Sequence, residues 1–188
     1  MEAFSDGVIA IIITIMVLEL RAPHGTDLAT LKPLLPVFLC YLLSFIYLAI
    51  YWNNHHHLLR SVHYISGRVL WANVHLLFWL SLIPFVTAWM GENKIDIFPV
   101  VLYGLVLFMA AMAYYILAHI LAVLHGKDSS IAHALGRDWK GKLSLVLYAS
   151  GIALSFVHPY IGFTLYVTVA AIWFIPDRRF EKRYDSPG

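Results

Sequence analysis

Long apolar runs and short polar connectors alternate along the whole chain. The apolar runs cover residues 4–20, 34–59, 69–90, 97–125, 142–157 and 159–176, and the last two meet at a tight turn at Pro159. About 20 apolar residues allow a helix to cross the hydrocarbon core of a bilayer. A helix of a soluble protein shows a polar face, and most of these runs show none. The pattern predicts an all-α integral membrane protein, a bundle of six transmembrane helices that forms one domain over residues 1–188.

The composition agrees with a membrane protein. Hydrophobic residues make up 61% of the chain and charged residues 13%, whereas a soluble domain has about 25% charged residues. The net charge is +2 and no basic patch lies within a predicted helix, so we expect no nucleic-acid partner. The single cysteine, Cys40, lies inside an apolar run and has no partner for an intrachain disulfide.

Lysine and arginine residues favour one side of the predicted bundle. With six crossings, the two termini and the connectors after the second and fourth segments share one side. That side carries ten basic residues: Arg60, Arg68, Lys127, Arg137, Lys140, Lys142, Arg178, Arg179, Lys182 and Arg183. The other side carries three: Arg21, Lys32 and Lys94. Since basic residues are retained on the cytoplasmic side of a membrane, both termini are predicted to be cytoplasmic.

This topology places polar residues of four segments at one depth. They are Ser5, Asp6, Trp52, Asn53, Asn54, His55, His56, His57, Trp71, His75 and His119. Ionisable residues within a membrane usually face the bundle interior and pair with one another. Asp6 stands in the first turn of its helix, where a carboxylate can accept from free backbone N–H groups. Either Asp6 only caps its helix, or it also bonds a histidine or indole of the second segment and so ties the first helix to the bundle.

The three consecutive histidines do not have the spacing of a metal site. Neighbouring residues of a helix point about 100° apart, so His55, His56 and His57 cannot converge on one ion, and a zinc-binding helix uses an i, i+4 pair. The chain also has no GxSxG motif, no Walker loop and no pair of carboxylates deep in a predicted span. We therefore expect a protein that is not an enzyme and that binds no resident metal or cofactor.

Besides the function that the two motifs described below indicate, two other functions remain open. A proton-coupled or small-solute transporter could use the intramembrane histidine layer, although such proteins usually place a carboxylate near the membrane midplane and the core spans hold none. Glu19 lies at the outer end of the first segment. A membrane enzyme or haem protein with paired histidines is the third interpretation.

The first segment carries one stripe with the spacing of a helix seam. Ile11, Ile15 and Leu18 follow each other at intervals of four and three residues, which brings side chains onto one helix face. Thr14 is the one polar side chain in the run from Val8 to Leu18, and such a threonine commonly bonds a backbone carbonyl of its own helix. Because the run is apolar all round, its periodicity does not choose which face is buried.

Two motifs stand at the start of the first segment and at the end of the second. The first is Phe4-Ser5-Asp6, and the second is Trp52 with His55 three residues later, followed by Leu58. Together they resemble the bacterial branch of the lysosomal potassium-channel family, transmembrane protein 175, and the six spans and cytoplasmic termini agree over essentially the whole chain. The resemblance implies a potassium-permeable cation channel of the bacterial inner membrane, whose partners are potassium ions, the lipid bilayer and further copies of the chain.

The resemblance further implies a homotetramer in which four copies of the first helix line a central pore. The family lacks the TVGYG filter of ordinary potassium channels, and so does this sequence. The isoleucine constriction of the family would fall on Ile11, with hydrophobic layers at Ile15 and Leu18, and Thr14 would contribute to ion selection. A ring of large aliphatic side chains can close a pore by dewetting.

An anchoring network for the first helix is also implied by the resemblance. It would consist of Phe4, Ser5, Asp6, Trp52 and His55. The family motif has an arginine four positions before the phenylalanine, which is one position ahead of Met1. Either the protein lacks this arginine or the printed sequence begins after it, and the network would be one cation short or would use His55 as the partner of Asp6.

Overall fold

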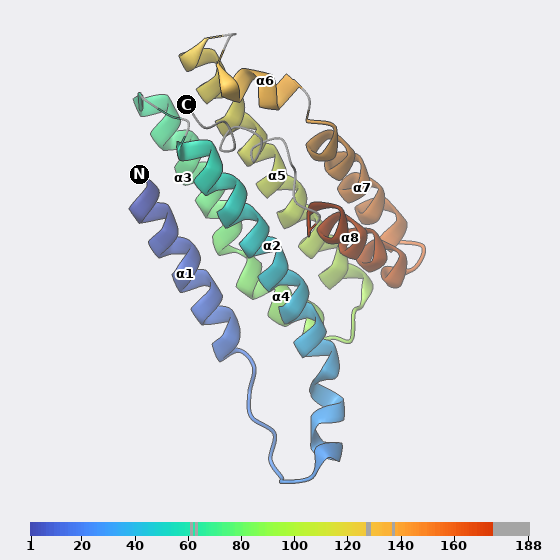
Figure 1. The fold of residues 1–188 in the computed structure, drawn as a ribbon. Helices are drawn as coiled ribbons and strands as arrows, with labels where there is room; N and C mark the ends of the chain where they lie inside the picture. Colours follow the sequence, from blue (N-terminus) through green and yellow to red (C-terminus); the bar gives the residue numbers. More distant parts are fainter. Residues whose placement is uncertain (61, 63, 127–128, 137, 175–188) are drawn as a thin grey trace, which may run out of the picture.

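The computed structural model describes residues 1–60, 62, 64–126, 129–136 and 138–174, which contain helices and no strands (Figure 1). The elements in chain order are α1 (Glu2–Leu18), η1 (Leu28–Leu34), α2 (Leu35–Arg60), α3 (Gly67–Ser81), α4 (Ile83–Glu92), α5 (Ile97–His125), α6 (Ser130–Gly136), α7 (Trp139–Ser155) and α8 (Pro159–Phe174). η1 is a 3₁₀-helix that leads directly into α2.

The all-helical prediction is confirmed for these residues, and each predicted apolar run lies mostly on helix, with residues 19–20, 82 and 156–157 outside one. The run 97–125 coincides with α5, whose first backbone N–H, that of Ile97, is accepted by the side chain of Asp96. α8 begins at Pro159, the position where a missing N–H costs a helix least. The predicted end of the last run, residues 175–176, lies outside the described residues.

The run 69–90 was predicted as one helix and is two, because the chain breaks at Leu82 between α3 and α4. Pro84 explains the break, since its ring clashes with the carbonyl four residues earlier and it donates no backbone hydrogen bond. The pattern of apolar residues also missed the short helices η1 and α6, which lie in segments that read as connectors.

Among the residues that the structure describes, three stretches are long and apolar enough to cross a membrane by length and composition. They are Leu28–Arg60, Gly67–Glu92, which joins α3 and α4, and Ile97–His125. α1 and α7 have 17 residues each and α8 has 16, at the lower limit of about 17 residues for a transmembrane helix.

The basic residues that the structure describes separate between the two ends of the bundle. Arg60, Arg68, Lys140 and Lys142 belong to the end where α1, α3 and α7 begin and α2 terminates, whereas Arg21, Lys32 and Lys94 belong to the opposite end. The remaining six residues of the predicted cytoplasmic set lie outside the described residues: Lys127, Arg137, Arg178, Arg179, Lys182 and Arg183.

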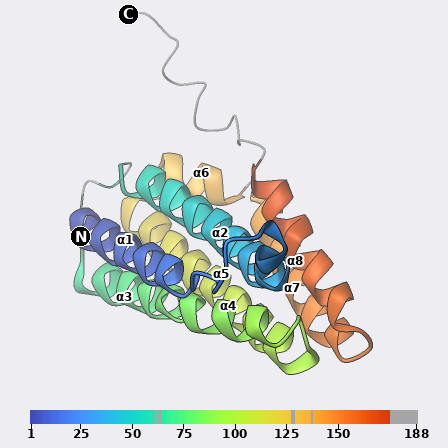
Figure 2. The same cartoon turned by 90° about the horizontal axis from the view of Figure 1, so that it is seen from below.

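The helices form an elongated bundle in which α5 is central and α1 lies at one edge. α1 packs against α2, α3 and α4, while α7 and α8 cover α5 on the opposite side, as Figures 1 and 2 show from two directions. Twelve residues of α5 are buried, but only four of α1. The edge position of α1 leaves one whole side of this helix without a partner inside the subunit.

A buried cluster of three hydroxyl groups joins the central helices. The Ser44 hydroxyl of α2 lies 2.7 Å from the Thr87 hydroxyl of α4 and 2.9 Å from the Tyr103 hydroxyl of α5, and Thr87 also donates to the Ile83 carbonyl at 2.6 Å. In an apolar bundle, such hydrogen bonds between helices replace the water that polar groups would otherwise require. The cluster fixes how α2, α4 and α5 are placed against one another.

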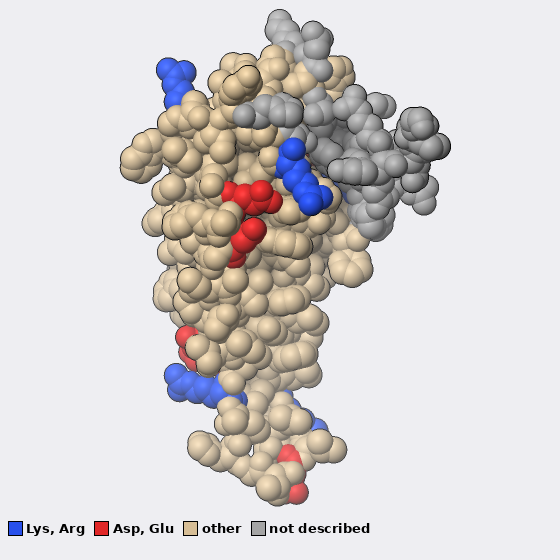
Figure 3. Space-filling view, turned by 60° about the vertical axis from the view of Figure 1, so that its left-hand side comes forward, with Lys and Arg blue, Asp and Glu red and all other residues tan. Residues whose placement is uncertain are grey.

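Charged side chains leave a band of the α1 side free. In Figure 3, acidic and basic groups lie in the upper half of this face and again in its lower part, and uncharged residues fill the surface between them. An uncharged band between two charged ends is the surface that a bilayer requires of a protein that spans it.

Candidate functional site

α1 has two faces of different character. Its buried residues are Ser5, Ile9, Ile12 and Met16, spaced by four, three and four positions, and they form the stripe that packs against the bundle. The spacing is that of one side of an α-helix. The sequence could not choose this face because the opposite side of the helix is equally apolar.

The opposite face holds the predicted pore residues. Exposed fractions are 61% for Ile11, 44% for Ile15 and 73% for Leu18, and Thr14 is exposed between them. Phe4 is 63% exposed and precedes Ile11 by seven residues, as Ile11 precedes Leu18. Residues seven apart lie within about 20° of one another around a helix, so Phe4 belongs to the exposed stripe and not to the polar contacts beside Ser5.

The Thr14 hydroxyl forms the local bond that the sequence predicted. It donates to the carbonyl of Ala10, one turn earlier, at 2.9 Å. A hydroxyl oxygen that donates its hydrogen retains lone pairs. Thr14 therefore presents an acceptor oxygen on the exposed face of α1, between the side chains of Ile11 and Ile15.

The buried side of α1 is tied to two helices by a hydrogen-bond chain near its N-terminus. The Asn73 amide of α3 donates to the Ser5 hydroxyl of α1 at 3.0 Å, and the Asn73 side-chain oxygen lies 2.7 Å from Nε2 of His55 on α2. All three residues are at least 99% buried. These hydrogen bonds thus connect α1, α3 and α2 in the buried interior of the bundle.

The directions of these bonds follow from the donors available. The Ser5 hydroxyl lies 3.2 Å from the carbonyl of Met1, and a carbonyl can only accept, so Ser5 donates to it. Asn73 must then donate its N–H to Ser5, which turns the Asn73 oxygen towards His55 and requires a proton on Nε2 of His55. In this series of hydrogen bonds, which runs from Met1 through Ser5 and Asn73 to His55, each bond determines the donor and acceptor of the next.

Asn73 was missed by the sequence analysis, which expected Trp71 and His75 of the same helix to join the layer. Trp71 is 76% exposed, and His75 accepts a bond at 2.9 Å from Trp79 one turn along its own helix. An asparagine within the apolar run of α3 was a usable signal, because an amide buried among apolar residues needs partners on other helices.

Asp6 bonds the indole of Trp52, one of the two partners that the sequence proposed. Nε1 of Trp52 donates to Oδ1 of Asp6 at 3.0 Å and joins α2 to α1. The predicted capping role is wrong, because Met1 occupies the N-cap position and the helix has no side-chain cap bond. His55 does not act as a substitute partner of Asp6, because its side chain forms its hydrogen bond with Asn73.

A second contact between α1 and α2 lies beside the first. Nδ1 of His56 is 2.9 Å from Oε1 of Glu2, and the imidazole of His56 stacks on the Trp52 ring with centroids 5.7 Å apart and planes 21° apart. His55 points into the bundle, whereas His57 is exposed. The side chains of the three consecutive histidines therefore lie in three different environments, as their helical spacing predicted.

The histidine layer proposed for a transporter does not assemble around His55. His75 is bonded to Trp79 on its own helix, and His119 is exposed and stacks on Tyr115 of its own helix with centroids 6.2 Å apart. A proton relay needs titratable groups within hydrogen-bond reach of one another, and these three histidines do not provide it.

The fold and the α1 contacts define a helical membrane protein with an apolar helix anchored at its edge. The chain belongs to the family described as the endosomal/lysosomal potassium channel TMEM175, whose sequence profile matches residues 1–84. The matched part runs from α1 into α4 and contains both motifs and Asn73. This is a family of channels and not of enzymes.

One relative and one solved structure match the chain over most of its length, and a second relative matches half of it. A potassium channel of Chryseobacterium sp. (strain P1-3) is 52% identical over 182 residues, which are 97% of this chain and 95% of that protein. A potassium channel of Chamaesiphon minutus is 37% identical over 100 residues, half of this chain and 49% of that protein. The crystal structure of a lysosomal potassium-selective channel TMEM175 homolog from Chamaesiphon minutus matches with a TM-score of 0.81 and 27% identity, over 93% of this chain and 94% of that one.

Proposed function

We propose that the protein is a potassium-permeable cation channel in which four copies of the chain surround a central pore lined by α1. The observation that carries the proposal is the exposed stripe of α1, which holds Ile11, Ile15 and Leu18 while the other face is fastened to the bundle. The related proteins that are named as potassium channels support potassium as the transported ion.

The anchoring contacts support a pore helix more than a helix that merely faces lipid. A lipid-facing helix can be held by apolar packing alone, whereas α1 is also fixed by the Ser5–Asn73 bond and the Asp6–Trp52 bond. Polar bonds of this kind fix rotation about the helix axis as well as position. Fixed rotation matters if one face of α1 must point at a pore axis.

The stripe would close the pore by excluding water. With a rise of 1.5 Å per residue, Ile15 lies about 6 Å and Leu18 about 10 Å beyond Ile11 along the axis. Four copies would therefore form three successive aliphatic rings, and such rings gate by dewetting. Thr14 would contribute its hydroxyl oxygen as a weak cation ligand, because its hydrogen is engaged by Ala10.

The proposal includes six crossings, both termini in the cytoplasm and residence in the bacterial inner membrane. The described basic residues support this orientation, since Arg60, Arg68, Lys140 and Lys142 gather at the end that holds the start of α1. Cytoplasmic loops retain such residues.

The test is a planar-bilayer recording of the purified protein with potassium on one side and sodium on the other. The proposal expects single-channel events and a reversal potential displaced towards the potassium equilibrium. Equal permeability to the two ions would refute potassium preference, and a flux without channel events would refute the channel. Mass measurement in mild detergent tests the stoichiometry separately, with four chains expected.

A further inference from the structure

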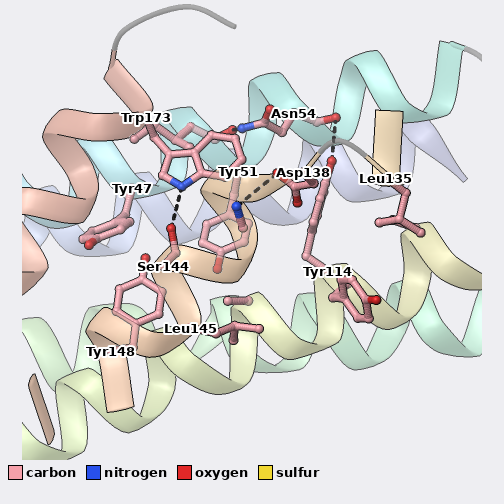
Figure 4. Close-up of a pocket in the computed structure, with 15 residues that line it drawn as sticks. Tyr47, Tyr51, Asn54, Tyr114, Leu135, Asp138, Ser144, Leu145, Tyr148 and Trp173 are labelled. Atoms are coloured by element: carbon pink, nitrogen blue, oxygen red, sulfur yellow. Dashed lines mark hydrogen bonds between the residues drawn. The ribbon is translucent and has the colours of Figure 1, made fainter. Parts of the chain in front are cut away.

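Indole groups near the end of the bundle where α3 and α7 begin have two kinds of surroundings. Trp173 of α8 is half-buried, and its Nε1 donates to Ser144 at 2.9 Å beside the slot between α2, α5 and α7 (Figure 4). Trp71 of α3 is 76% exposed, and its N–H has no hydrogen-bond partner in the part of the chain that the structure describes. An indole with an apolar ring and a free N–H suits a membrane interface, where one side is apolar and the other is wet.

Trp71 belongs to a stripe of exposed residues on α3. The stripe consists of Arg68, Trp71, Val74 and Phe78, and the last two are 44% and 55% exposed. At 3.6 residues per turn, these four positions fall within an arc of about 120° around the helix, and the buried residues of α3 lie outside this arc. This α3 stripe is therefore the face of the helix that points away from the bundle.

Arg68 stands at the edge of a candidate membrane span. It is the second residue of α3 and of the stretch Gly67–Glu92, and helical side chains lean towards the N-terminus of their helix, so its side chain leans out of the span. Arg68 is exposed and has no acidic partner among the residues that the structure describes. Because a guanidinium is always charged and can donate two parallel hydrogen bonds to a phosphate, Arg68 is available to a phosphate group at this edge.

The length of the α3 stripe matches one leaflet of a bilayer. Phe78 follows Arg68 by 10 residues, which is about 15 Å along the helix axis at a rise of 1.5 Å per residue. One leaflet contributes about half of a hydrocarbon core that is roughly 30 Å thick. A phospholipid that lies along α3 would thus have its phosphate at Arg68, its ester oxygens near the N–H of Trp71, and an acyl chain on Val74 and Phe78.

The charge of the stripe favours an anionic lipid. Arg68 is the one ionisable group among its four residues. A zwitterionic headgroup carries an amine of the same sign as the guanidinium, whereas an anionic headgroup without an amine offers only the phosphate. Basic side chains at the edge of a transmembrane helix therefore attract anionic lipids.

We infer that the α3 stripe is a binding site for an anionic phospholipid in the leaflet at the end where α3 begins. Arg68 binds the lipid phosphate, Trp71 marks the interface, and the apolar remainder of the stripe holds an acyl chain. The site lies within one subunit, and it requires neither the tetramer nor ion conduction.

The experiment places the purified protein in phosphatidylcholine vesicles that contain either brominated phosphatidylglycerol or brominated phosphatidylcholine. Bromine on an acyl chain quenches an indole that it touches, and the share of Trp71 is the difference in quenching between the wild type and Trp71→Phe. This share should show an about five-fold preference for phosphatidylglycerol, the size expected from one basic side chain at an anionic lipid surface. Equal quenching of Trp71 by the two lipids would overturn the site.

The second arm removes the charge. Arg68→Gln should abolish the preference and leave Trp71 quenched equally by both lipids. Lys142→Gln is the control, because it removes one exposed positive charge at the same end of the bundle, on α7, which packs against the other side of α5. The preference should survive Lys142→Gln. A preference that survives Arg68→Gln, or that both variants abolish, would refute a site at Arg68.

Two further results distinguish the lipid from other occupants of the stripe. Millimolar inorganic phosphate should not displace the brominated lipid, and displacement would assign Arg68 to a free phosphate. Little quenching of Trp71 by either lipid would mean that a second copy of the chain covers the stripe, which would also overturn the site. Because Arg68 and Trp71 are exposed, their variants should unfold at nearly the temperature of the wild type.

Discussion

α1 and α5 are both apolar helices, yet the bundle uses them in opposite ways. Neither has an acidic or basic residue deep in its run, and both would read as transmembrane segments from hydropathy alone. α5 is covered by α3 and α4 on one side and by α7 and α8 on the other, whereas α1 touches α2, α3 and α4 with one face only. Hydropathy shows that each helix can lie in a membrane, whereas the neighbouring helices determine which of its faces are buried.

The difference lies in how each helix is held. α5 is held by close packing of many apolar side chains on several sides, and the buried Tyr103 hydroxyl adds one directed hydrogen bond to Ser44. α1 has little packing area and is held by directed hydrogen bonds to Asn73 and Trp52. Since hydrogen bonds weaken steeply when misaligned, α1 gains a defined rotation from few contacts. This arrangement suits a helix whose free face has a function.

The largest effect is expected from a polar residue on the free face of α1. Ile11→Asn would hydrate the narrowest ring of the proposed pore, so the open probability and leak current should rise several-fold, since hydrophobic gates depend on dewetting. The measurement is macroscopic current in proteoliposomes or planar bilayers at equal protein density. An unchanged current would exclude Ile11 as the constriction.

The control for Ile11→Asn is the neighbouring residue on the same helix. Ile12 is 3% exposed and faces the bundle, so Ile12→Asn should lower thermal stability without raising the current. If both variants raised the current equally, the effect would come from loosening of α1 and not from hydration of one face.

Truncation of the α5 core tests the other half of the comparison. Leu107 is fully buried, and Leu107→Ala should cost about 2–5 kcal/mol of stability through lost transfer energy and the remaining cavity. Leu18→Ala removes the same atoms from the exposed face of α1 and should change stability by less than about 0.5 kcal/mol. Thermal unfolding in detergent compares them, and equal losses would contradict the exposed position of Leu18.

The helices could be predicted from the sequence because hydrophobicity and length report directly on what a bilayer accepts. The run 97–125 is α5 without adjustment, since Asp96 caps its start and Gly126 follows its end. The break at Leu82 was not predicted because the run through Pro84 remains apolar, and apolarity conceals a kink. η1 and α6 were missed because short helices in connectors depend on contacts that no local pattern reveals.

Part of the candidate site could likewise be predicted from the sequence, and part could not. The Asp6–Trp52 bond was among the alternatives drawn from the sequence, because the two residues share a depth and have complementary donor and acceptor groups. The role of Asn73 was not predicted. Whether Trp71, Asn73 or His75 faces α1 depends on the rotation of α3 about its axis, and the sequence of a largely apolar helix does not reveal this rotation. The exposed face of α1 likewise required the positions of α2, α3 and α4.

A smaller effect is expected from breaking the buried chain at its centre. Asn73→Leu keeps the side-chain size but leaves the Ser5 hydroxyl oxygen and the Nε2–H of His55 without their partner, which should cost about 1–3 kcal/mol. Asn53→Leu at an exposed asparagine of α2 is the matched control and should remain within about 0.5 kcal/mol of the wild type. Thermal unfolding separates them, and similar stabilities for the two variants would mean that the chain does not hold α1.

The smallest effect is expected from Trp52→Phe, which tests whether the second anchor acts through its hydrogen bond or through its ring. Phenylalanine keeps an aromatic ring beside His56 but has no N–H for Asp6, so the loss should be about 0.5–1.5 kcal/mol. Because the contact is exposed, water can replace part of the bond, which places the loss at the lower end. Asp6→Ala removes the acceptor of the same bond and should cost a similar amount. The double variant decides the matter: if the two losses simply add, the residues do not interact, whereas a combined loss smaller than the sum measures the coupling that holds the rotation of α1.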